Sequence, residues 1–276
     1  MKTRIISAIV AIILAVVILF FHNTIVFNIA ISLFTVIMLY EIFTALKILE
    51  FKLSTCVCYV FGVVFPILSY SSLYKFKLPF ILICVFALFC TFLYQHEKLP
   101  FEKLASMITS TALITFAMNS LITIKLSNEK YGVFLLILSL CGAWLADTGA
   151  YFAGTLMGKH KLCPSISPKK TVEGLIGGTI TNALLFIGIG LIYSLFQANK
   201  DNIIDINYFY IAILGMLCSL IGLLGDLSAS LLKRQCGIKD YGNIMPGHGG
   251  VLDRFDSILF VVPFMCIATG YFNLIQ

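Results

Sequence analysis

Charged side chains gather in one stretch of this sequence, residues 225–256. Its acids and its histidine are Asp226, Asp240, His248, Asp253 and Asp256, and lysines and arginines lie between them. Carboxylates are the protein groups that usually share Mg²⁺ with substrate phosphates, and basic side chains bind phosphate oxygens. Only 12% of the chain is charged, and polar groups beside apolar spans are costly unless they have a function. The stretch therefore predicts metal-assisted chemistry on a phosphate-bearing substrate.

The first part of this stretch predicts a helix with one polar face. Asp226, Ser230 and Lys233 are four and then three residues apart, which places them on the same side of a helix, and Arg234 is adjacent. The acid and the first base are then about 10 Å apart along the helix axis. This arrangement suits a metal at the acid and phosphate oxygens at the base.

A loop rich in glycine and proline follows, and two acids begin the next apolar run. The loop KDYGNIMPGHGG can bring backbone N–H groups close to a ligand. Asp253 and Asp256 are three residues apart and should face the same way, as paired oxygen ligands of Mg²⁺ would. The alternative is that both are acids in the first turn of a helix, where the helix dipole favours them.

A further acid, Asp147, lies inside the apolar run 132–157, roughly 15 Å before its end. A bare carboxylate is costly there, so we expect it to face a polar cavity, a cation or a metal. The alternative is a hydrogen-bonded aspartate that only packs helices. The same run has a small residue at every fourth position, which predicts close contact with another helix. These small residues are Gly142, Ala146, Ala150, Gly154 and Gly158.

The segment SPKKT, residues 167–171, predicts an anion site. Ser167 followed by Pro168 has the form of a helix start, with the serine as N-cap. Lys169 and Lys170 would then lie in the first helical turn, where cations oppose the helix dipole. A bound anion, held by free N–H groups and by both lysines, would resolve this conflict. The alternative is that the lysines only anchor the chain at a membrane surface.

The rest of the chain must hold these groups in a membrane. Of its 276 residues 60% are hydrophobic, and the mean hydropathy is +1.01, whereas soluble domains contain about 45–50% apolar residues. Apolar runs of roughly 20 residues cross a bilayer as helices. We therefore predict an all-α, polytopic integral membrane protein with about nine transmembrane helices. The predicted spans are 5–21, 25–46, 53–74, 78–95, 104–124, 132–157, 174–196, 207–232 and 251–275.

The positive charges predict how these helices are oriented. If the N-terminus is cytoplasmic, the opposite side keeps Lys75, Lys77, Lys125, Lys130 and Lys200, and the other 14 of the 19 lysines and arginines are cytoplasmic. The positive-inside rule favours this arrangement. The charged loops 158–173 and 233–250 then share the cytoplasmic face and can build one site. Membrane topology therefore explains the net charge of +6 better than nucleic-acid binding does.

The polar sites divide the chain into two parts. Residues 1–130 form about five spans with little chemistry, and residues 131–276 form about four spans with the charged loops. We expect the second part to be catalytic. Glu41, in the second span, is the one acid of the first part that could lie below the membrane surface. It has either a functional role or a position near the interface, where its side chain extends to water.

Residues 230–256, SLLKRQCGIKDYGNIMPGHGGVLDRFD, resemble the signature of the phosphatidate cytidylyltransferases, the CDP-diacylglycerol synthases. That signature reads S-x-x-K-R, four residues, K-D-x-G, and then P-x-H-G-G-x-x-D-R-x-D. Met245 replaces the Leu, Ile or Phe that is more usual before Pro246, which changes little. SPKKTVEG and the helix around Asp147 also resemble family segments. The resemblance thus covers the C-terminal half well and the N-terminal half only as a set of spans.

The resemblance implies a reaction of phospholipid biosynthesis. The phosphate of phosphatidic acid attacks the α-phosphorus of CTP, giving CDP-diacylglycerol and pyrophosphate. Phosphoryl transfer needs alignment and charge neutralisation more than covalent chemistry. The implied cofactor is Mg²⁺, alone or with a second cation, held by Asp226 and Asp253 with Asp147 and Asp256 in support.

The implied substrate contacts come mainly from basic side chains. Lys169, Lys170, Lys233 and Arg234 would hold the phosphates, and His248 would bind phosphate or orient its loop, since an anionic lipid phosphate needs no strong base. Further substrate contacts are expected from Ser167, Thr171, Glu173, Ser230, Lys239, Asp240, Gly249, Gly250 and Arg254.

The expected partners are CTP, phosphatidic acid and membrane lipid, without nucleic acid. A homodimer is implied by the resemblance alone. The expected location is the cell membrane, the inner one in a bacterium, with the active site facing the cytoplasm.

Two other functions are compatible with these residues. A CTP-dependent kinase of the polyprenol or dolichol type would transfer the γ-phosphate and release CDP instead of pyrophosphate. An ion-coupled transporter would use Asp147 and Asp226 as substrate or proton sites. A transporter should, however, have broken helices near the middle of the bilayer, whereas the polar residues here cluster on one face.

Overall fold

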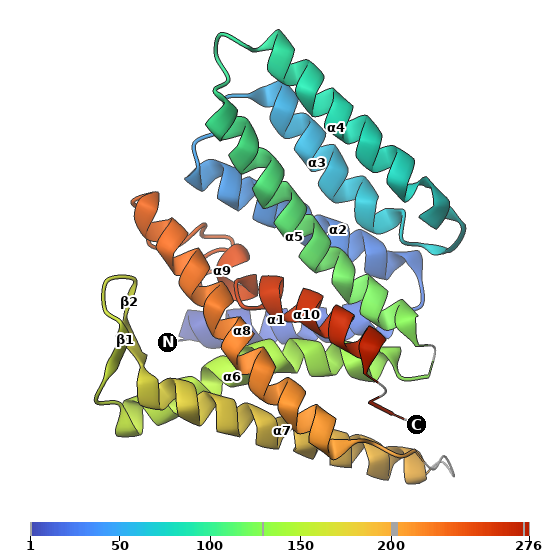
Figure 1. Ribbon diagram of the computed structural model, residues 1–276, viewed down its shortest axis with the longest axis vertical. Coiled ribbons are helices and arrows are strands. Elements are labelled where there is room, and N and C mark those ends of the chain that lie inside the picture. The colour runs from blue at the N-terminus through green and yellow to red at the C-terminus, as the bar shows by residue number, and fades with distance from the viewer. Residues whose placement is uncertain (1, 129, 200–203, 273, 276) are drawn as a thin grey trace. The chain divides into compact units, whose positions relative to one another are not determined.

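The computed structural model describes residues 2–128, 130–199, 204–272, 274 and 275, and these are almost entirely helical (Figure 1). The chain forms two compact units. Unit 1 consists of Met1–Ile122 and Gln235–Phe255, and unit 2 of Thr123–Arg234 and Asp256–Gln276. The functional division at residue 130 stays a prediction.

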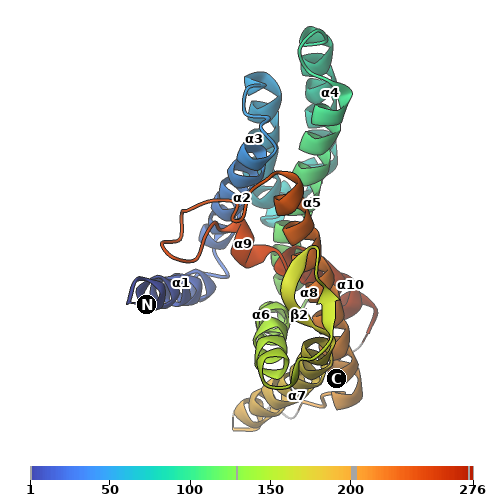
Figure 2. The same ribbon diagram turned by 90° about the vertical axis from the view of Figure 1, so that its left-hand side faces the viewer.

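Unit 1 contains the first helices and a late loop. Its core forms where α2, α3 and α5 meet, around the buried side chains of Met38, Leu39, Cys58, Met107 and Met118. The loop that follows Gln235 leads into the short helix α9, which packs beside α2 (Figure 2). The elements are α1 (Lys2–Phe20), α2 (Ile25–Ala45), α3 (Lys52–Ile67), the 3₁₀ helix η1 (Ser71–Phe76), α4 (Lys77–Tyr94), most of α5 (Phe101–Ser127) and α9 (Leu252–Phe255).

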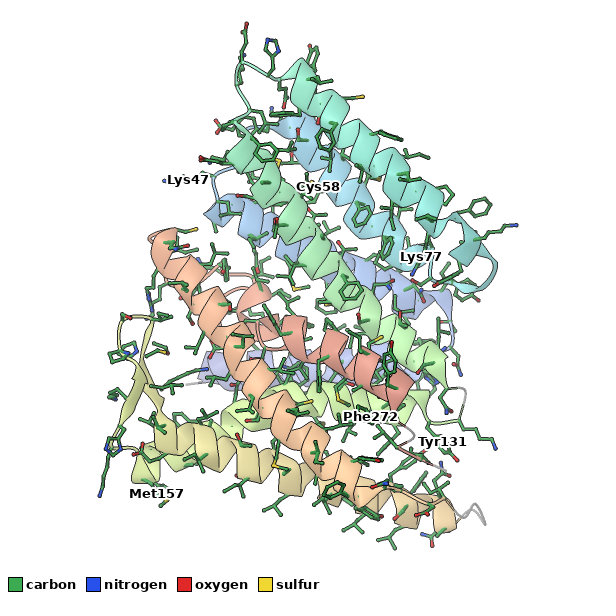
Figure 3. The ribbon with its side chains drawn as sticks, viewed as in Figure 1. Lys47, Cys58, Lys77, Tyr131, Met157 and Phe272 are labelled. Carbon is green, nitrogen blue, oxygen red and sulfur yellow. The ribbon has the colours of Figure 1, made fainter. Side chains whose placement is uncertain are left out.

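The cations of unit 1 lie at the helix ends. Lys47 follows α2 and Lys77 begins α4, and Figure 3 shows them at opposite ends of these helices. The Lys103 ammonium donates hydrogen bonds of 3.0 and 3.2 Å to the carbonyls of Leu46 and Lys47. It thereby satisfies carbonyl groups that the end of α2 leaves free.

Unit 2 packs three long helices around one buried amide. Asn182 of α7 is fully buried, and its Nδ2 donates to the carbonyls of Gly142 in α6 (3.2 Å) and Gly215 in α8 (2.7 Å). The elements are α6 (Gly132–Met157), β1 (Lys161–Cys163), β2 (Ser167–Thr171), α7 (Val172–Ala198), α8 (Tyr208–Gln235) and α10 (Ile258–Tyr271).

The small residues of α6 lie against glycines of α7, which confirms the predicted close helix contact. A Cβ atom added at Gly178 would come within 2.9 Å of the Ala146 carbonyl oxygen, and one at Gly174 within 2.8 Å of the Ala150 carbonyl oxygen. Because real side chains do not approach backbone so closely, the two helices can pack here only without them.

Six helices of the described residues are long and apolar enough to cross a membrane, so the chain is a polytopic membrane protein of nearly all-α structure. They are Ile25–Ala45, Leu73–Tyr94, Phe101–Ser127, Gly132–Met157, Val172–Ala198 and Tyr208–Gln235. The other predicted spans correspond to the shorter apolar helices Ile9–Phe20, Lys52–Ile67 and Ile258–Tyr271. The count of nine spans and the cytoplasmic N-terminus stay predictions.

The last predicted span, 251–275, is not continuous, and this part of the prediction is wrong. Helix α9 ends at Phe255, and α10 begins at Ile258. Between them the Asp256 carboxylate accepts a hydrogen bond of 2.8 Å from the Ser257 N–H. Aspartate often competes in this way with the hydrogen bonds of a helix backbone. Asp256 therefore lies in a turn, outside both helices.

Candidate active site

A lysine and an aspartate form an ion pair in unit 2. The Lys170 ammonium on β2 contacts the Asp226 carboxylate on α8, and both side chains are about four-fifths buried, with 21% and 23% of their surface exposed. The Ser230 hydroxyl donates to the other Asp226 oxygen at 3.2 Å, which confirms that these two residues share a helix face. The two segments that the sequence separates by more than 50 residues thus meet at one carboxylate.

Two further carboxylates accompany this pair. The Ser257 hydroxyl donates to Asp147 at 3.0 Å, and Ser257 is the residue after Asp256. Burial raises the pKa of the Asp256 carboxyl to about 7; the charges of Asp226 and Asp147 act in the same direction, and Lys233 opposes them. Negative charge is therefore crowded around Asp256 and would be relieved by a cation.

Replacing Asp256 by Asn should stabilise the protein in buffer without divalent cations at pH 8. The raised pKa means that the folded protein loses stability as pH rises from about 4 towards 7, because the charged carboxylate is disfavoured only in the folded state. The neutral amide removes this cost, so we expect a melting temperature a few degrees higher at pH 8 and a clearly smaller gain at pH 5, where only part of the cost is present.

Asp205→Asn is the control, because Asp205 is an exposed acid of the same unit. Equal gains at both pH values, or a loss at pH 8, would contradict the crowding of charge around Asp256.

The segment SPKKT is not the start of a helix, so the prediction of an N-cap at Ser167 is wrong. Residues Ser167–Thr171 form strand β2, which pairs antiparallel with β1, and α7 begins at Val172. The N-cap is Thr171, whose hydroxyl accepts a hydrogen bond of 3.1 Å from the Gly174 N–H. The lysines therefore do not lie in a first helical turn, and the dipole conflict that predicted an anion there does not arise.

The N-terminus of α7 is already satisfied by its own residues. Glu173 lies in the first turn, where the dipole favours an acid, and its carboxylate accepts a hydrogen bond of 2.6 Å from the His160 ring Nδ1. The His160 N–H also donates to both Glu173 oxygens at 3.2 Å. Thr171 and Glu173 thus fix the hairpin to the helix, and a substrate contact from either stays a prediction.

The loop of unit 1 that precedes α9 is organised around the Asp253 carboxylate. One oxygen of its carboxylate accepts hydrogen bonds from the N–H groups of Tyr241 (2.8 Å) and Gly250 (2.9 Å). Asp253 lies in the first turn of α9, as the alternative interpretation expected, and is 9% exposed. Gly249 has a φ of +89°, a conformation that suits glycine and lets the loop turn beside this carboxylate.

Glu41 of α2, far from this loop in the sequence, also binds its backbone. Its two oxygens accept hydrogen bonds from Val251 N–H (2.9 Å) and Leu252 N–H (2.7 Å), and the residue is only 2% exposed. Sequence reasoning left its role open, because an acid in an apolar run shows that a partner is needed but not which backbone supplies it. Because Glu41 is buried, the alternative prediction, in which its side chain extends to water near the membrane surface, is wrong.

His248 orients the loop rather than standing alone. Its Nδ1 lies 2.7 Å from the Ser7 hydroxyl on α1, and its carbonyl oxygen accepts two hydrogen bonds from the Arg254 guanidinium, at 3.1 and 2.7 Å. Arg254 therefore braces the loop. Phosphate binding by either residue stays a prediction.

The remaining predicted substrate contacts are solvent-accessible basic groups and one acid. Lys169 is exposed on β2, Arg234 is exposed at the end of α8, and Lys233 beside it is half-buried. Lys239 and Asp240 are exposed in the loop of unit 1. Lys169, Arg234 and Lys239 are thus accessible to phosphates, and substrate binding by any of these residues stays a prediction.

The oxygen donors suit Mg²⁺, but they do not form a ready ligand set. Among the described residues, no group of three or more His, Cys, Asp or Glu side chains is close enough to hold a metal ion. The Lys170 ammonium supplies positive charge to Asp226 instead. Asp253 belongs to unit 1, whereas Asp147, Asp226 and Asp256 belong to unit 2, so the predicted set of four stays a prediction.

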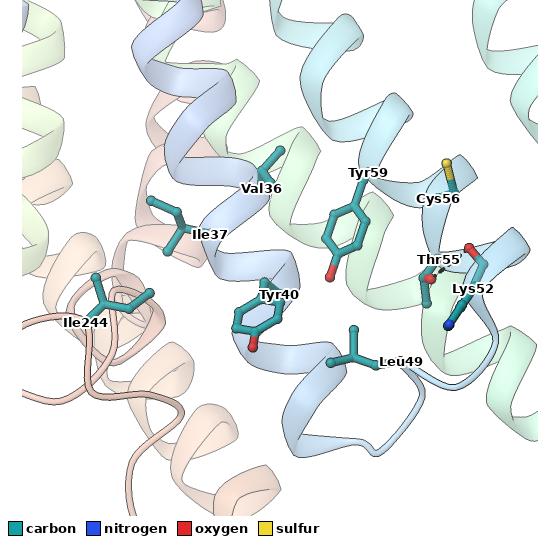
Figure 4. A pocket seen from close by; sticks show the side chains of 9 residues that line it. All are labelled: Val36, Ile37, Tyr40, Leu49, Lys52, Thr55, Cys56, Tyr59 and Ile244. Carbon is teal, nitrogen blue, oxygen red and sulfur yellow. Dashed lines mark hydrogen bonds between the residues drawn. The ribbon is translucent and has the colours of Figure 1, made fainter.

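A groove of about 540 Å³ in unit 1 lacks the chemistry of a metal site (Figure 4). Its lining includes one cation, Lys52, and no acid, and otherwise consists mainly of aliphatic and aromatic side chains. Ile244 contributes to it from the loop that carries Asp253. Without carboxylates, the groove is not a candidate for the predicted Mg²⁺ site.

The sequence of this chain is similar to those of known proteins. The model of the cytidylyltransferase family matches residues 2–272. A phosphatidate cytidylyltransferase of Bacillus subtilis (strain 168) is 43% identical over 145 residues, 52% of this chain and 51% of the relative. Those of Staphylococcus saprophyticus and Staphylococcus aureus (strain COL) are each 45% identical over 138 residues, 49% of this chain and 49% of each relative.

These pairwise matches span about half the length of the curated relatives, whereas the family model extends over both units. It includes the aspartate cluster of unit 2 and the loop around Asp253. The resemblance seen in residues 230–256 is thereby confirmed, and the chain belongs to the cytidylyltransferase family.

Proposed function

We propose that this chain transfers the cytidylyl group of CTP to phosphatidic acid, giving CDP-diacylglycerol and pyrophosphate for phospholipid biosynthesis. The observation that carries the proposal is the Lys170–Asp226 pair among further carboxylates, in a chain of the cytidylyltransferase family. The curated relatives are named phosphatidate cytidylyltransferases, which supports phosphatidate as the acceptor.

In this reaction the basic side chains bind and align phosphates. Without substrate, Lys170 neutralises Asp226, and it would exchange this partner for phosphate oxygens of CTP. Lys169 is exposed on the same strand and would bind the same triphosphate. Lys233 and Arg234, in the last turn of α8, would bind the lipid phosphate. Alignment of this kind can account for much of the acceleration of a phosphoryl transfer.

The carboxylates would hold Mg²⁺, with Asp226 and Asp253 as main ligands and Asp147 and Asp256 in support. Bound Mg²⁺ neutralises charge that develops on the phosphates. The proposal needs no strong base, because the lipid phosphate is already anionic near neutral pH. His248 and Arg254 then act by holding the loop of unit 1.

The proposal places the catalytic face in the cytoplasm, where CTP is found. The cations of the loops support this orientation through the positive-inside rule. Bacterial relatives support a location in the cell membrane. A homodimer is part of the proposal only through the family resemblance.

The test uses purified protein in lipid nanodiscs with phosphatidic acid, CTP and Mg²⁺, and CTP labelled at the α- or the γ-phosphate. We expect the α-label to enter the lipid and the γ-label to leave as pyrophosphate, and EDTA to stop both. A γ-label in the lipid together with CDP would instead show a lipid kinase. No labelled lipid with either CTP, in a preparation that is folded, would contradict cytidylyl transfer and leave a transporter as the better hypothesis.

A further inference from the structure

The Glu41 carboxylate binds a loop that lies 210 residues further along the chain. Each of its oxygens accepts one backbone hydrogen bond, at 2.9 Å from Val251 and 2.7 Å from Leu252. Glu41 is 2% exposed, so these bonds form away from water, where an ionised group needs all its partners. The contact is therefore a specific connection between α2 and the loop, and lies wholly within unit 1.

Two glycines allow the loop to reach this carboxylate. A Cβ atom added at Gly250 would come within 2.6 Å of Glu41 Oε1, and one added at Gly242 also within 2.6 Å of that oxygen. Neither glycine has the positive φ seen at Gly249, so close approach rather than backbone conformation is what demands a missing side chain. The loop is thus shaped to enclose the Glu41 carboxylate.

The anchored residues directly precede Asp253. Val251 and Leu252 bind Glu41, and the next residue is the aspartate whose carboxylate accepts hydrogen bonds from Tyr241 and Gly250. Gly250 therefore packs on Glu41 and donates its N–H to Asp253. A displacement of Glu41 would pass to Asp253 through one or two peptide units.

We propose that Glu41 is a positioning residue: it fixes loop 241–252 so that the Asp253 carboxylate is held in place before substrate binds. The expected effect of Glu41 on turnover rests on the proposed function, whereas its expected effect on the loop does not. Glu41 itself touches neither substrate nor metal in this proposal. Its role is to keep the backbone on the amino-terminal side of Asp253 from moving.

The first experiment follows the loop without any assay of activity. Hydrogen–deuterium exchange of full-length protein in nanodiscs should show faster exchange across residues 241–252 in Glu41→Gln. The substitution replaces one carboxylate oxygen by an NH₂ group, which cannot accept a hydrogen bond from the loop backbone. The matched control is Asn28→Ala, a buried change on the same helix that removes a 2.8 Å hydrogen bond to the Pro66 carbonyl. The control should destabilise α2 but leave exchange in the loop unchanged.

The second experiment separates positioning from general loss of stability. We expect Glu41→Gln to lower kcat by about 10- to 100-fold while the apparent KM for CTP changes less than about threefold, as expected when a group is misplaced in the transition state. Asn28→Ala, at a similar melting temperature, should keep kcat within about twofold of the unchanged protein. A common fall in kcat for both variants would reduce Glu41 to an ordinary structural residue and overturn the proposal.

A pair of variants covers the case in which Glu41→Gln does not fold. Gly250→Ala places a methyl group against the Glu41 carboxylate, and Glu41→Asp shortens that side chain by one methylene group. If the Glu41 carboxylate and the residue at position 250 act on each other, the shorter aspartate should make room for the added methyl group. The kcat of the double variant should then be at least about fivefold higher than the kcat expected from multiplying the effects of the two single variants. Independent effects would overturn the proposal. Normal loop protection in Glu41→Gln would also overturn it. Lost protection in Glu41→Gln, together with no CDP-diacylglycerol from the unchanged protein, would refute only the proposed function.

Discussion

Asp226→Asn should lower kcat by about a thousandfold, which corresponds to about 4 kcal/mol of transition-state stabilisation. The amide keeps the shape of the side chain and can still accept the Ser230 hydrogen bond, but it removes the charge that Lys170 pairs with and that Mg²⁺ would need. The protein should therefore fold and insert normally. Initial rates of CDP-diacylglycerol formation over a range of Mg²⁺ concentrations measure the effect.

The matched control is again Asp205→Asn, the same chemical change at an exposed site of unit 2. It should leave the rate within about twofold of the unchanged protein. Near-normal turnover of Asp226→Asn at saturating Mg²⁺ would contradict the assignment of Asp226 to the metal, and a Lys170→Ala variant with full activity would weaken the exchange of partners proposed for that lysine.

Asp253→Asn should lower kcat by at least about a hundredfold while the loop around it stays ordered. One Asp253 oxygen accepts both loop hydrogen bonds, and an amide oxygen can take its place, so the geometry can survive without the charge. The expected result is slow turnover with normal hydrogen–deuterium exchange in residues 241–252.

Asp253→Ala gives the contrasting case. It removes the acceptor of Tyr241 and Gly250, so both turnover and loop protection should be lost. An Asp253→Asn protein that is active at saturating Mg²⁺ would show that Asp253 only holds the loop. Loss of protection in the Asn variant would show that its charge is needed for the fold as well.

The apolar helices could be predicted from the sequence because the length and hydropathy of each run decide whether it can cross a membrane. The bounds of α6, Gly132–Met157, follow from hydropathy alone, and its small residues predicted the contact with α7. Asp226 and Ser230 could be paired because four residues make about one helical turn. These features depend on local spacing, which a sequence displays directly.

Other features could not be predicted because they depend on partners distant in the chain. Ser167 has the form of an N-cap, but β2 pairs with β1 and the N-cap of α7 is Thr171 instead. The break at Asp256 interrupts an apolar run without any glycine or proline at that point. Glu41 is an isolated acid in the sequence, and only the fold shows that a loop 210 residues away encloses it. Tertiary contacts override local preference in each case.

The strand at residues 167–171 makes two neighbouring lysines unequal. Successive side chains of a strand point to opposite faces, whereas in the helix expected there they would have been only about 100° apart around the helix axis. Lys170 turns inward to Asp226, and Lys169 faces solvent. The two lysines therefore have different roles. Lys170 neutralises a carboxylate of the protein itself. Lys169 remains in water, where an arriving polyanion would contact it first.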